Sequence, residues 1–143
     1  MGGFANYWEK VIMNTFFNIS GTLYTASRVT TNLWVGLSSA DPLDDASGVS
    51  EPPGKGYLRI KTTNASATTW QVADATGTTI DNASAIEFAA ASADWGTMTH
   101  FCLFSGGTAG ASLCAYGALS ASKTIENGDI ARFAIGQLDI CLK

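Results

Sequence analysis

The sequence predicts an all-β fold, a jelly-roll-like antiparallel β-sandwich of about eight strands with one α-helix near the N-terminus. Segments rich in branched and aromatic residues recur about every 10 residues, which is typical of sandwich strands. Glycine, proline and asparagine separate these segments, and only residues 3–19 have a helical pattern. We find neither an internal repeat nor a linker, so we expect residues 1–143 to form a single domain.

Residues 3–19 are predicted to form an amphipathic helix. Their apolar side chains recur at helical spacing and include Phe4, Trp8 and Ile12, which places them on one stripe. Gly21 follows and can end the helix. A stripe with so many aromatic residues requires cover. Either the helix packs against its own sandwich, or it packs against a neighbouring subunit.

The first predicted strand is followed by a long loop. Residues 33–37 alternate apolar with smaller groups, which predicts a strand with one buried face. Residues 39–56 contain all three prolines and four of the acidic residues, and they include Pro-Pro and Gly-Lys-Gly sequences that cannot continue a β-ladder. We therefore expect a long surface loop, and loops of this length in compact domains are usually functional or mobile.

The next strands are predicted at residues 57–62, 68–72 and 85–89, with a turn-rich break at 74–79. Residues 97–104 and 111–119 then indicate a β-hairpin whose Gly-rich loop is longer than two residues. Large apolar groups occupy both faces of residues 97–104, so this strand is expected to lie between two layers at the centre of the fold.

The C-terminal part is also predicted to be β-structure. After a short β-segment at Thr124 and Ile125, the sequence Asn127-Gly128 indicates a tight turn. Residues 130–142 follow as β-structure. Their alternation shifts by one residue around Gly136, which indicates a bulge there.

The charge balance excludes some classes of partner. Only 14% of the residues are charged, the net charge is −4, and no basic cluster is present, so we expect no nucleic-acid binding. No apolar run is long enough to span a membrane, and no secretion signal precedes the domain, so we expect the chain to fold in a cytoplasm. Low charge with 46% hydrophobic residues indicates either a surface covered by a partner or a compact monomer coated with Thr, Ser and Ala.

One histidine and three cysteines are the only residues that suggest metal chemistry. A hairpin turning near Thr108 would place Cys114 opposite Cys102, with His100 on the same face as Cys102. Zinc sites of one His and three Cys exist, but the usual C-x2-4-C spacing is absent. A metal site, a Cys102–Cys114 disulfide and inert reduced cysteines therefore remain open, and we favour the last; the role of Cys141 is equally open.

No enzyme signature is present. The acids of residues 39–56 could in principle hold a cation or act as catalytic carboxylates, but acids on a Pro/Gly loop are more simply solvated. No G-x-S-x-G nucleophile elbow or phosphate-binding glycine loop occurs, and His100 on a buried strand is a poor general base. We therefore predict a non-enzymatic protein without a cofactor.

Many short segments have a familiar sequence and order. They are Asp94–Phe101 (DWGTMTHF), Gly117–Leu119, Lys123–Ile125, Asn127–Asp129, Phe133–Leu138, Asn6–Glu9, Leu33–Ser38, Asp41-Pro42, Glu51-Pro52 and Gly56–Arg59. Together they resemble a family of small virion proteins of tailed bacteriophages, often labelled tail fibre proteins, some of which look like capsid cement (decoration) proteins. Cys102 and Cys114 depart from it, because the family pattern leads us to expect glycine or small apolar residues there.

The resemblance implies a trimeric β-sandwich in the virion, often seated where capsid subunits meet. It predicts a capsid decoration protein that binds as a homotrimer across adjacent copies of the major capsid protein and stabilises the shell. A tail or head fibre component involved in host attachment is the alternative. A carbohydrate-binding module is a third hypothesis, and it requires Trp34, Trp70 and Trp95 to line an exposed groove.

The predicted contact surfaces are the helix stripe and the long loop. On the helix they are Phe4, Trp8 and Ile12. On the loop and its flanks they are Asp41, Asp44, Asp45, Glu51 and Lys55.

Overall fold

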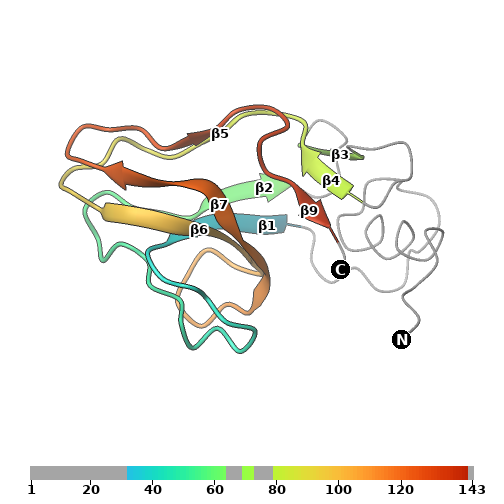
Figure 1. The fold of residues 1–143 in the computed structure, drawn as a ribbon, viewed down its shortest axis with the longest axis horizontal. Helices are drawn as coiled ribbons and strands as arrows, with labels where there is room; N and C mark the ends of the chain where they lie inside the picture. Colours follow the sequence, from blue (N-terminus) through green and yellow to red (C-terminus); the bar gives the residue numbers. More distant parts are fainter. Residues whose placement is uncertain (1–31, 64–68, 73–78, 142–143) are drawn as a thin grey trace. The chain divides into compact units, whose positions relative to one another are not determined.

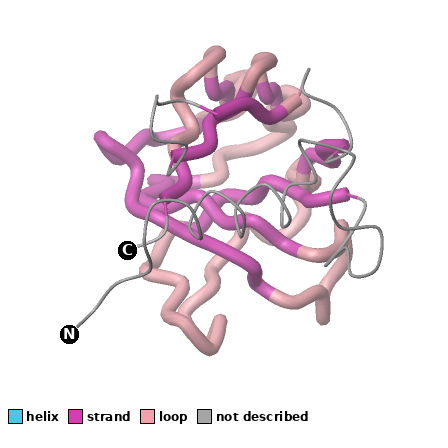
Figure 2. The backbone as a smooth tube through the Cα atoms, turned by 90° about the vertical axis from the view of Figure 1, so that its right-hand side faces the viewer, coloured by secondary structure: helices cyan, strands magenta, loops and turns pink. Residues whose placement is uncertain are grey.

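The computed structural model describes residues 32–63, 69–72 and 79–141. These residues form nine strands and their connecting loops, without a helix (Figures 1 and 2). They belong to two compact units, one made of residues 33–62 and 87–132 and the other containing the remaining described residues. We name them the hairpin unit and the Asn82 unit. The helix predicted at residues 3–19 lies outside the described residues.

A four-stranded sheet forms the centre of the hairpin unit, in the order β2-β1-β6-β7. Its strands are β1 (Asn32–Ser38), β2 (Ile60–Thr63), β6 (Gly96–Phe104) and β7 (Leu113–Ile125). Strands β1 and β7 both pair antiparallel with β6, which lies between them (Figure 1). The strand that the sequence places at the centre of the fold is thus an inner strand of the largest described sheet.

The second half of strand β6 is buried on both faces. Phe101, Cys102, Leu103 and Phe104 are at most 8% exposed, and successive side chains of a strand point to opposite faces. The prediction of a strand buried on both faces is therefore confirmed for residues 101–104. For β1 the prediction of one buried face is wrong, because Val35 to Ser38 are all buried. The reason is the chain that follows β1, which brings the Glu51 and Tyr57 side chains against Gly36.

The β6–β7 hairpin closes later along the chain than expected. Ser105 N donates to Ser112 O, and Cys102 pairs with Tyr116. The expectation that Cys114 lies opposite Cys102 is therefore wrong. Strand β7 also runs through the two segments predicted separately. A register shift leaves residues 119–122 of β7 opposite Thr99 alone, as in a β-bulge.

A turn and an aromatic cluster connect the rest of the hairpin unit to this sheet. Asp129 N donates to Glu126 O, and Gly128 has φ 90°, so the predicted tight turn at Asn127-Gly128 is confirmed.

Three buried aromatic rings pack together in the loops of the hairpin unit. They are Tyr57, Phe88 and Trp95, with centroids 5.2 to 6.1 Å apart.

The Asn82 unit contains a three-stranded sheet in the order β3-β4-β9. Its strands are β3 (Trp70–Val72), β4 (Thr79–Asn82) and β9 (Ile140–Cys141). The fully buried Asn82 side chain makes four hydrogen bonds. Its Nδ2 donates to Ser84 O and Ala134 O, both at 2.8 Å, and its Oδ1 accepts from Gln137 N and Leu138 N at 3.1 and 2.9 Å. This amide therefore anchors the turn that leads into β9.

The neighbouring Asp81 is satisfied much less well. It is 8% exposed, and its buried Oδ1 has no hydrogen-bond partner.

Two short strands, β5 (Ile86–Glu87) and β8 (Arg132–Phe133), form a separate two-stranded sheet.

The described residues confirm the all-β class and antiparallel pairing. The jelly-roll arrangement and the single domain remain predictions. Strand β4 was missed, because Asp81 and Asn82 are residue types that are depleted in strands. Gly136 lies in a turn, with φ 68° and Gln137 N donating to Ala134 O, and not in the predicted bulge. The described residues contain no helix that is long and apolar enough to span a membrane.

Candidate functional site

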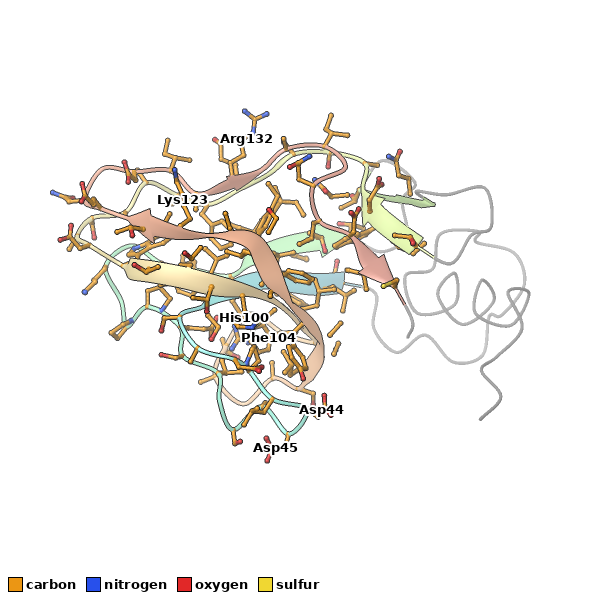
Figure 3. The ribbon with its side chains drawn as sticks, viewed as in Figure 1. Asp44, Asp45, His100, Phe104, Lys123 and Arg132 are labelled. Carbon is orange, nitrogen blue, oxygen red and sulfur yellow. The ribbon has the colours of Figure 1, made fainter. Side chains whose placement is uncertain are left out.

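Residues 39–56 form the most elaborate loop of the hairpin unit, as the sequence predicts. We call this segment the acidic loop. Asp41, Asp44, Asp45 and Lys55 are exposed on it, whereas Glu51 is half-buried. Figure 3 shows Asp44 and Asp45 at the outer end of the loop. The predicted contacts Phe4, Trp8 and Ile12 lie outside the described residues.

The first part of the acidic loop, residues 39–50, is closed at its base like an Ω-loop. Ser39 N donates to Ser50 O at 2.9 Å. The buried Ser38 hydroxyl accepts from Ser50 N at 3.0 Å and donates to Ala40 O at 2.7 Å. Because hydroxyls can both donate and accept, three serines close the base of the loop through hydrogen bonds.

Within the loop, two aspartate side chains accept hydrogen bonds from backbone amides that no strand or helix satisfies. Asp41 Oδ1 accepts from Leu43 N at 3.2 Å, and Asp45 Oδ1 accepts from Ser47 N at 3.0 Å. These are Asx-type turns, which local sequence alone can form. Hydrogen bonds from the side chain and the backbone of Ser47 lower the pKa of Asp45, so this carboxylate stays charged well below neutral pH.

Two residues of the first part of the loop, residues 39–50, have an unusual backbone conformation. Leu43 and Ala46 have φ 59° and 63°, a left-handed region in which side chains other than those of Gly and Asn are disfavoured. Gly48 N donates to Pro42 O, and an added Cβ at Gly48 would collide with Asp41 O. The loop is thus tightly wound, and it leaves the Leu43 side chain 48% exposed between carboxylates.

The loop is also attached to the sheet through its tip. The Tyr116 hydroxyl of β7 donates to Asp44 Oδ1 at 2.9 Å, and this hydrogen bond raises the pKa of Tyr116. Asp44 therefore has a role within the molecule besides the predicted contact with a partner.

The base of the acidic loop is held by an ion pair. Arg59 Nη2 lies 2.6 Å from Glu51 Oε2, with 8% and 20% of the respective side chains exposed. The guanidinium also donates from Nη1 to Gly106 O and Thr108 O, and it lies 3.4 Å from the centroid of the Phe104 ring. One side chain thus connects the acidic loop, the hairpin turn and the central strand.

Tyr57 completes this cluster. Its hydroxyl donates to Glu51 Oε1 at 2.7 Å and accepts from Leu37 N at 2.8 Å. Burial raises the pKa of Tyr57, so the phenol remains protonated and keeps its donor. Glu51 was predicted as a partner contact, and its visible role is to hold Tyr57 and Arg59 in place.

Lys55 lies in a turn that ends the acidic loop. Tyr57 N donates to Gly54 O, and Lys55 and Gly56 have φ 58° and 76°, which is the geometry of a type I′ turn. Lys55 Nζ donates to Asp94 O at 2.6 Å, and Lys55 O accepts from Trp95 Nε1 at 2.8 Å. The Lys55 ammonium thus donates a hydrogen bond within the protein, although the residue is exposed.

The residues with metal or redox chemistry do not form a site in the described parts of the chain. No three His, Cys, Asp or Glu side chains gather there into a group that could hold a metal ion. His100 Nδ1 lies 2.8 Å from the Thr99 hydroxyl. Burial raises the pKa of Cys102 to about 12, which keeps it as a thiol. Cys102, Cys114 and Cys141 are all free, so the Cys102–Cys114 disulfide is not formed.

Two of the tryptophans proposed for a carbohydrate groove are buried. Trp70 is fully buried and Trp95 is 5% exposed, so neither ring face is open to a sugar. Trp34 is half-buried, with Lys61 Nζ 5.9 Å from the ring centroid. The groove that the carbohydrate hypothesis requires is therefore not supported.

Sequence reasoning did not identify Tyr57, Arg59 or Tyr116 as parts of the site. A signal existed for Arg59, because a charged residue between Leu58 and Ile60 in a predicted strand needs a partner or solvent. The identity of its partner depends on pairing between distant segments, and sequence spacing does not give it.

The site offers a stiff, negatively charged loop, without a cluster of metal-binding side chains in the described residues. Comparison with curated proteins finds no match. A family model described as podophage GP4 fiber I protein gp80 matches residues 3–141. The matched range contains both described units, the acidic loop and its Glu51–Arg59 base. The chain therefore belongs to this family of small tailed-phage virion proteins, and it is a virion structural protein.

Proposed function

We propose that this protein is a fibre component of a podophage virion and that its role is structural, without catalysis or a cofactor. The observation that carries the proposal is the match to a family described as a fiber protein over residues 3–141. Nearly the whole chain takes part in this match. A fibre component acts by holding its place and presenting a surface, for which a rigid β-scaffold with ordered loops is suitable.

We propose that the acidic loop contacts another virion protein or the host surface. Its tip carries Asp41, Asp44 and Asp45 and the exposed Leu43. The serine closure and the Arg59 cluster order the loop before any partner is present, so binding loses little conformational entropy. Carboxylates around an apolar side chain fit a partner surface that is basic at its rim and apolar at its centre.

The homotrimer remains part of the proposal. Members of a closed ring bury the same pair of surfaces at every contact, so a small protein can project identical loops around one axis. The mass of the purified protein in solution tests this point, and a monomer at high concentration would contradict it.

Capsid decoration is the competing hypothesis, with the major capsid protein as partner. Copy number and location in purified particles distinguish the two roles. We expect antibody labelling at the tail or at discrete fibres and a low number of copies per particle by quantitative mass spectrometry. Uniform labelling of the head with a copy number close to that of the major capsid protein would overturn the fibre role in favour of decoration.

The role of the loop can be tested without unfolding it. In the triple variant Asp41→Asn, Asp44→Asn, Asp45→Asn, each side chain keeps an oxygen that can accept the hydrogen bonds of the turns, while three charges are lost. We expect reduced incorporation into particles, or reduced adsorption of particles to cells, with only a small change in thermal stability.

A matched control removes the same charge elsewhere. The variant Glu87→Gln, Glu126→Gln, Asp139→Asn changes three exposed acids outside the acidic loop. Equal losses in both variants would mean that net charge matters and the loop does not. Normal incorporation and adsorption of the loop variant would contradict the proposed contact.

A further inference from the structure

The turn at Asn127-Gly128 carries a chemistry that the proposed function does not use. It is the only Asn-Gly pair in the sequence, and both residues are exposed. Gly128 has φ 90°, and an added Cβ there would meet nothing within 4 Å. An asparagine followed by glycine is the dipeptide most prone to spontaneous deamidation, because no side chain shields the glycine nitrogen.

The reaction needs no enzyme. The backbone nitrogen of Gly128, after losing its proton, attacks Cγ of the Asn127 side chain. A new N–Cγ bond forms, the bond from Cγ to the amide nitrogen breaks, and ammonia leaves with the proton. Water then opens the cyclic imide at either carbonyl, which gives aspartate or isoaspartate. The balance is one water consumed and one ammonia released, without oxidation or reduction.

The native turn opposes each requirement of this attack. Gly128 N donates to Ala91 O at 2.7 Å, so its proton is held in a hydrogen bond. Asn127 N donates to Asp94 Oδ1 at 2.9 Å, and Asp129 N donates to Glu126 O at 3.0 Å. The nitrogen can approach the side-chain carbonyl only after these bonds open, and local opening has a free-energy cost.

We propose that Asn127 is the deamidation site of this protein and that the hydrogen bonds of its turn keep the reaction slow until the turn opens. The fraction of Asn127 that is deamidated therefore increases with the total time that the turn has spent open. The isoaspartate product carries one extra backbone methylene, which breaks the register of the bonds to Ala91 and Glu126. Its new carboxylate also lies beside Asp94 and Asp129, so the modified turn does not close as before.

The test compares the full-length protein in native buffer and in denaturing urea, at the same mildly alkaline pH. Peptide mapping by mass spectrometry measures deamidation at Asn127 over time. We expect the native rate to be lower by about tenfold or more, since each tenfold corresponds to a modest opening cost. Asn82, which is buried and followed by alanine, serves as the internal reference.

Two variants assign the effect to the turn. Asp94→Ala removes the acceptor for Asn127 N and is expected to raise the native rate, without changing the rate in urea. Asn127→Gln removes the reaction, because the longer side chain would have to form a larger ring. Equal rates in native buffer and urea would overturn the protection by the turn. Deamidation in urea no faster at Asn127 than at Asn82 would overturn the assignment of the site.

Discussion

Glu51 of the hairpin unit and Asp81 of the Asn82 unit are both carboxylates largely removed from water, and their surroundings differ sharply. Glu51 accepts hydrogen bonds from Tyr57 and from two nitrogens of Arg59, which neutralises its charge. Asp81 is 8% exposed, and its buried oxygen has no partner. The Glu51 carboxylate holds the base of the acidic loop through these hydrogen bonds. Burial of the Asp81 carboxylate oxygen without a partner instead lowers the free energy of unfolding.

The largest expected effect is the loss of the Glu51–Arg59 pair. Arg59→Ala would leave Glu51 with Tyr57 as its remaining donor and uncover the Phe104 ring. We expect a loss of about 3 kcal/mol in the free energy of unfolding, the usual cost of breaking a buried pair on one side. Urea unfolding followed by tryptophan fluorescence measures it.

The control for this variant is Arg132→Ala. Arg132 lies 3.9 Å from Glu87, and both side chains are 56% exposed, so we expect a change of less than about 0.5 kcal/mol. If Arg59→Ala cost no more than Arg132→Ala, the cluster would not be what holds the acidic loop.

The second-largest expected effect is the loss of stability on adding a side chain at Gly36, which packs against Glu51. A Cβ at Gly36 would lie 2.9 Å from Glu51 Oε1, 2.9 Å from the Tyr57 hydroxyl and 3.0 Å from Phe104. We expect Gly36→Ala to destabilise the protein by about 2 kcal/mol, as overpacking does. The same change should cost less in the Arg59→Ala background, where the cluster is already broken. Additive losses would show that Gly36 and Arg59 act independently.

Asp81→Asn is expected to act in the opposite direction. It replaces a carboxylate whose buried Oδ1 has no hydrogen-bond partner by a neutral side chain of nearly the same shape, so we expect a gain of about 1 kcal/mol in the free energy of unfolding. Asp139→Asn, an exposed acid of the same unit, should change stability much less. A loss of stability in Asp81→Asn would mean that the charge of Asp81 is compensated.

The smallest expected effect is a change in the pKa of Asp45, whose carboxylate is fully exposed. The Ser47 hydroxyl and amide hold the pKa of Asp45 below its ordinary value of 3.8. A lowered folded-state pKa contributes stability above the unfolded-state value, and this contribution is lost as the pH falls through the folded-state value. Ser47→Ala should raise the pKa of Asp45 in an NMR titration, and an unchanged titration would contradict the role of the hydroxyl.

The parts of the fold that depend on local pattern were predictable. Large apolar residues on both faces of residues 97–104 indicated the buried strand β6, and Asn127-Gly128 indicated the tight turn after β7. The acidic loop was predicted from its prolines and glycines. Its rigidity was not, because the bonds among Ser38, Ser39 and Ser50 join residues whose types also occur in open loops.

The parts that depend on distant partners were not predictable. The second buried face of β1 exists because Glu51 and Tyr57 fold back over Gly36. Strand β4 contains Asp81 and Asn82, which local propensity assigns to a turn, and the four bonds of Asn82 outweigh that propensity. Among the predicted contacts, Asp44, Glu51 and Lys55 also make hydrogen bonds within the molecule, and their contacts with a partner remain predictions.

The closure of residues 39–50 has a consequence for how such a protein can change. The chain leaves β1 after Ser38, and one backbone hydrogen bond joins Ser39 to Ser50. Because this closure lies at the base, we expect changes at the exposed positions between these two points to leave the register of β1 intact. The loop is therefore the segment of the hairpin unit in which we expect a displayed peptide to disturb the sheet least.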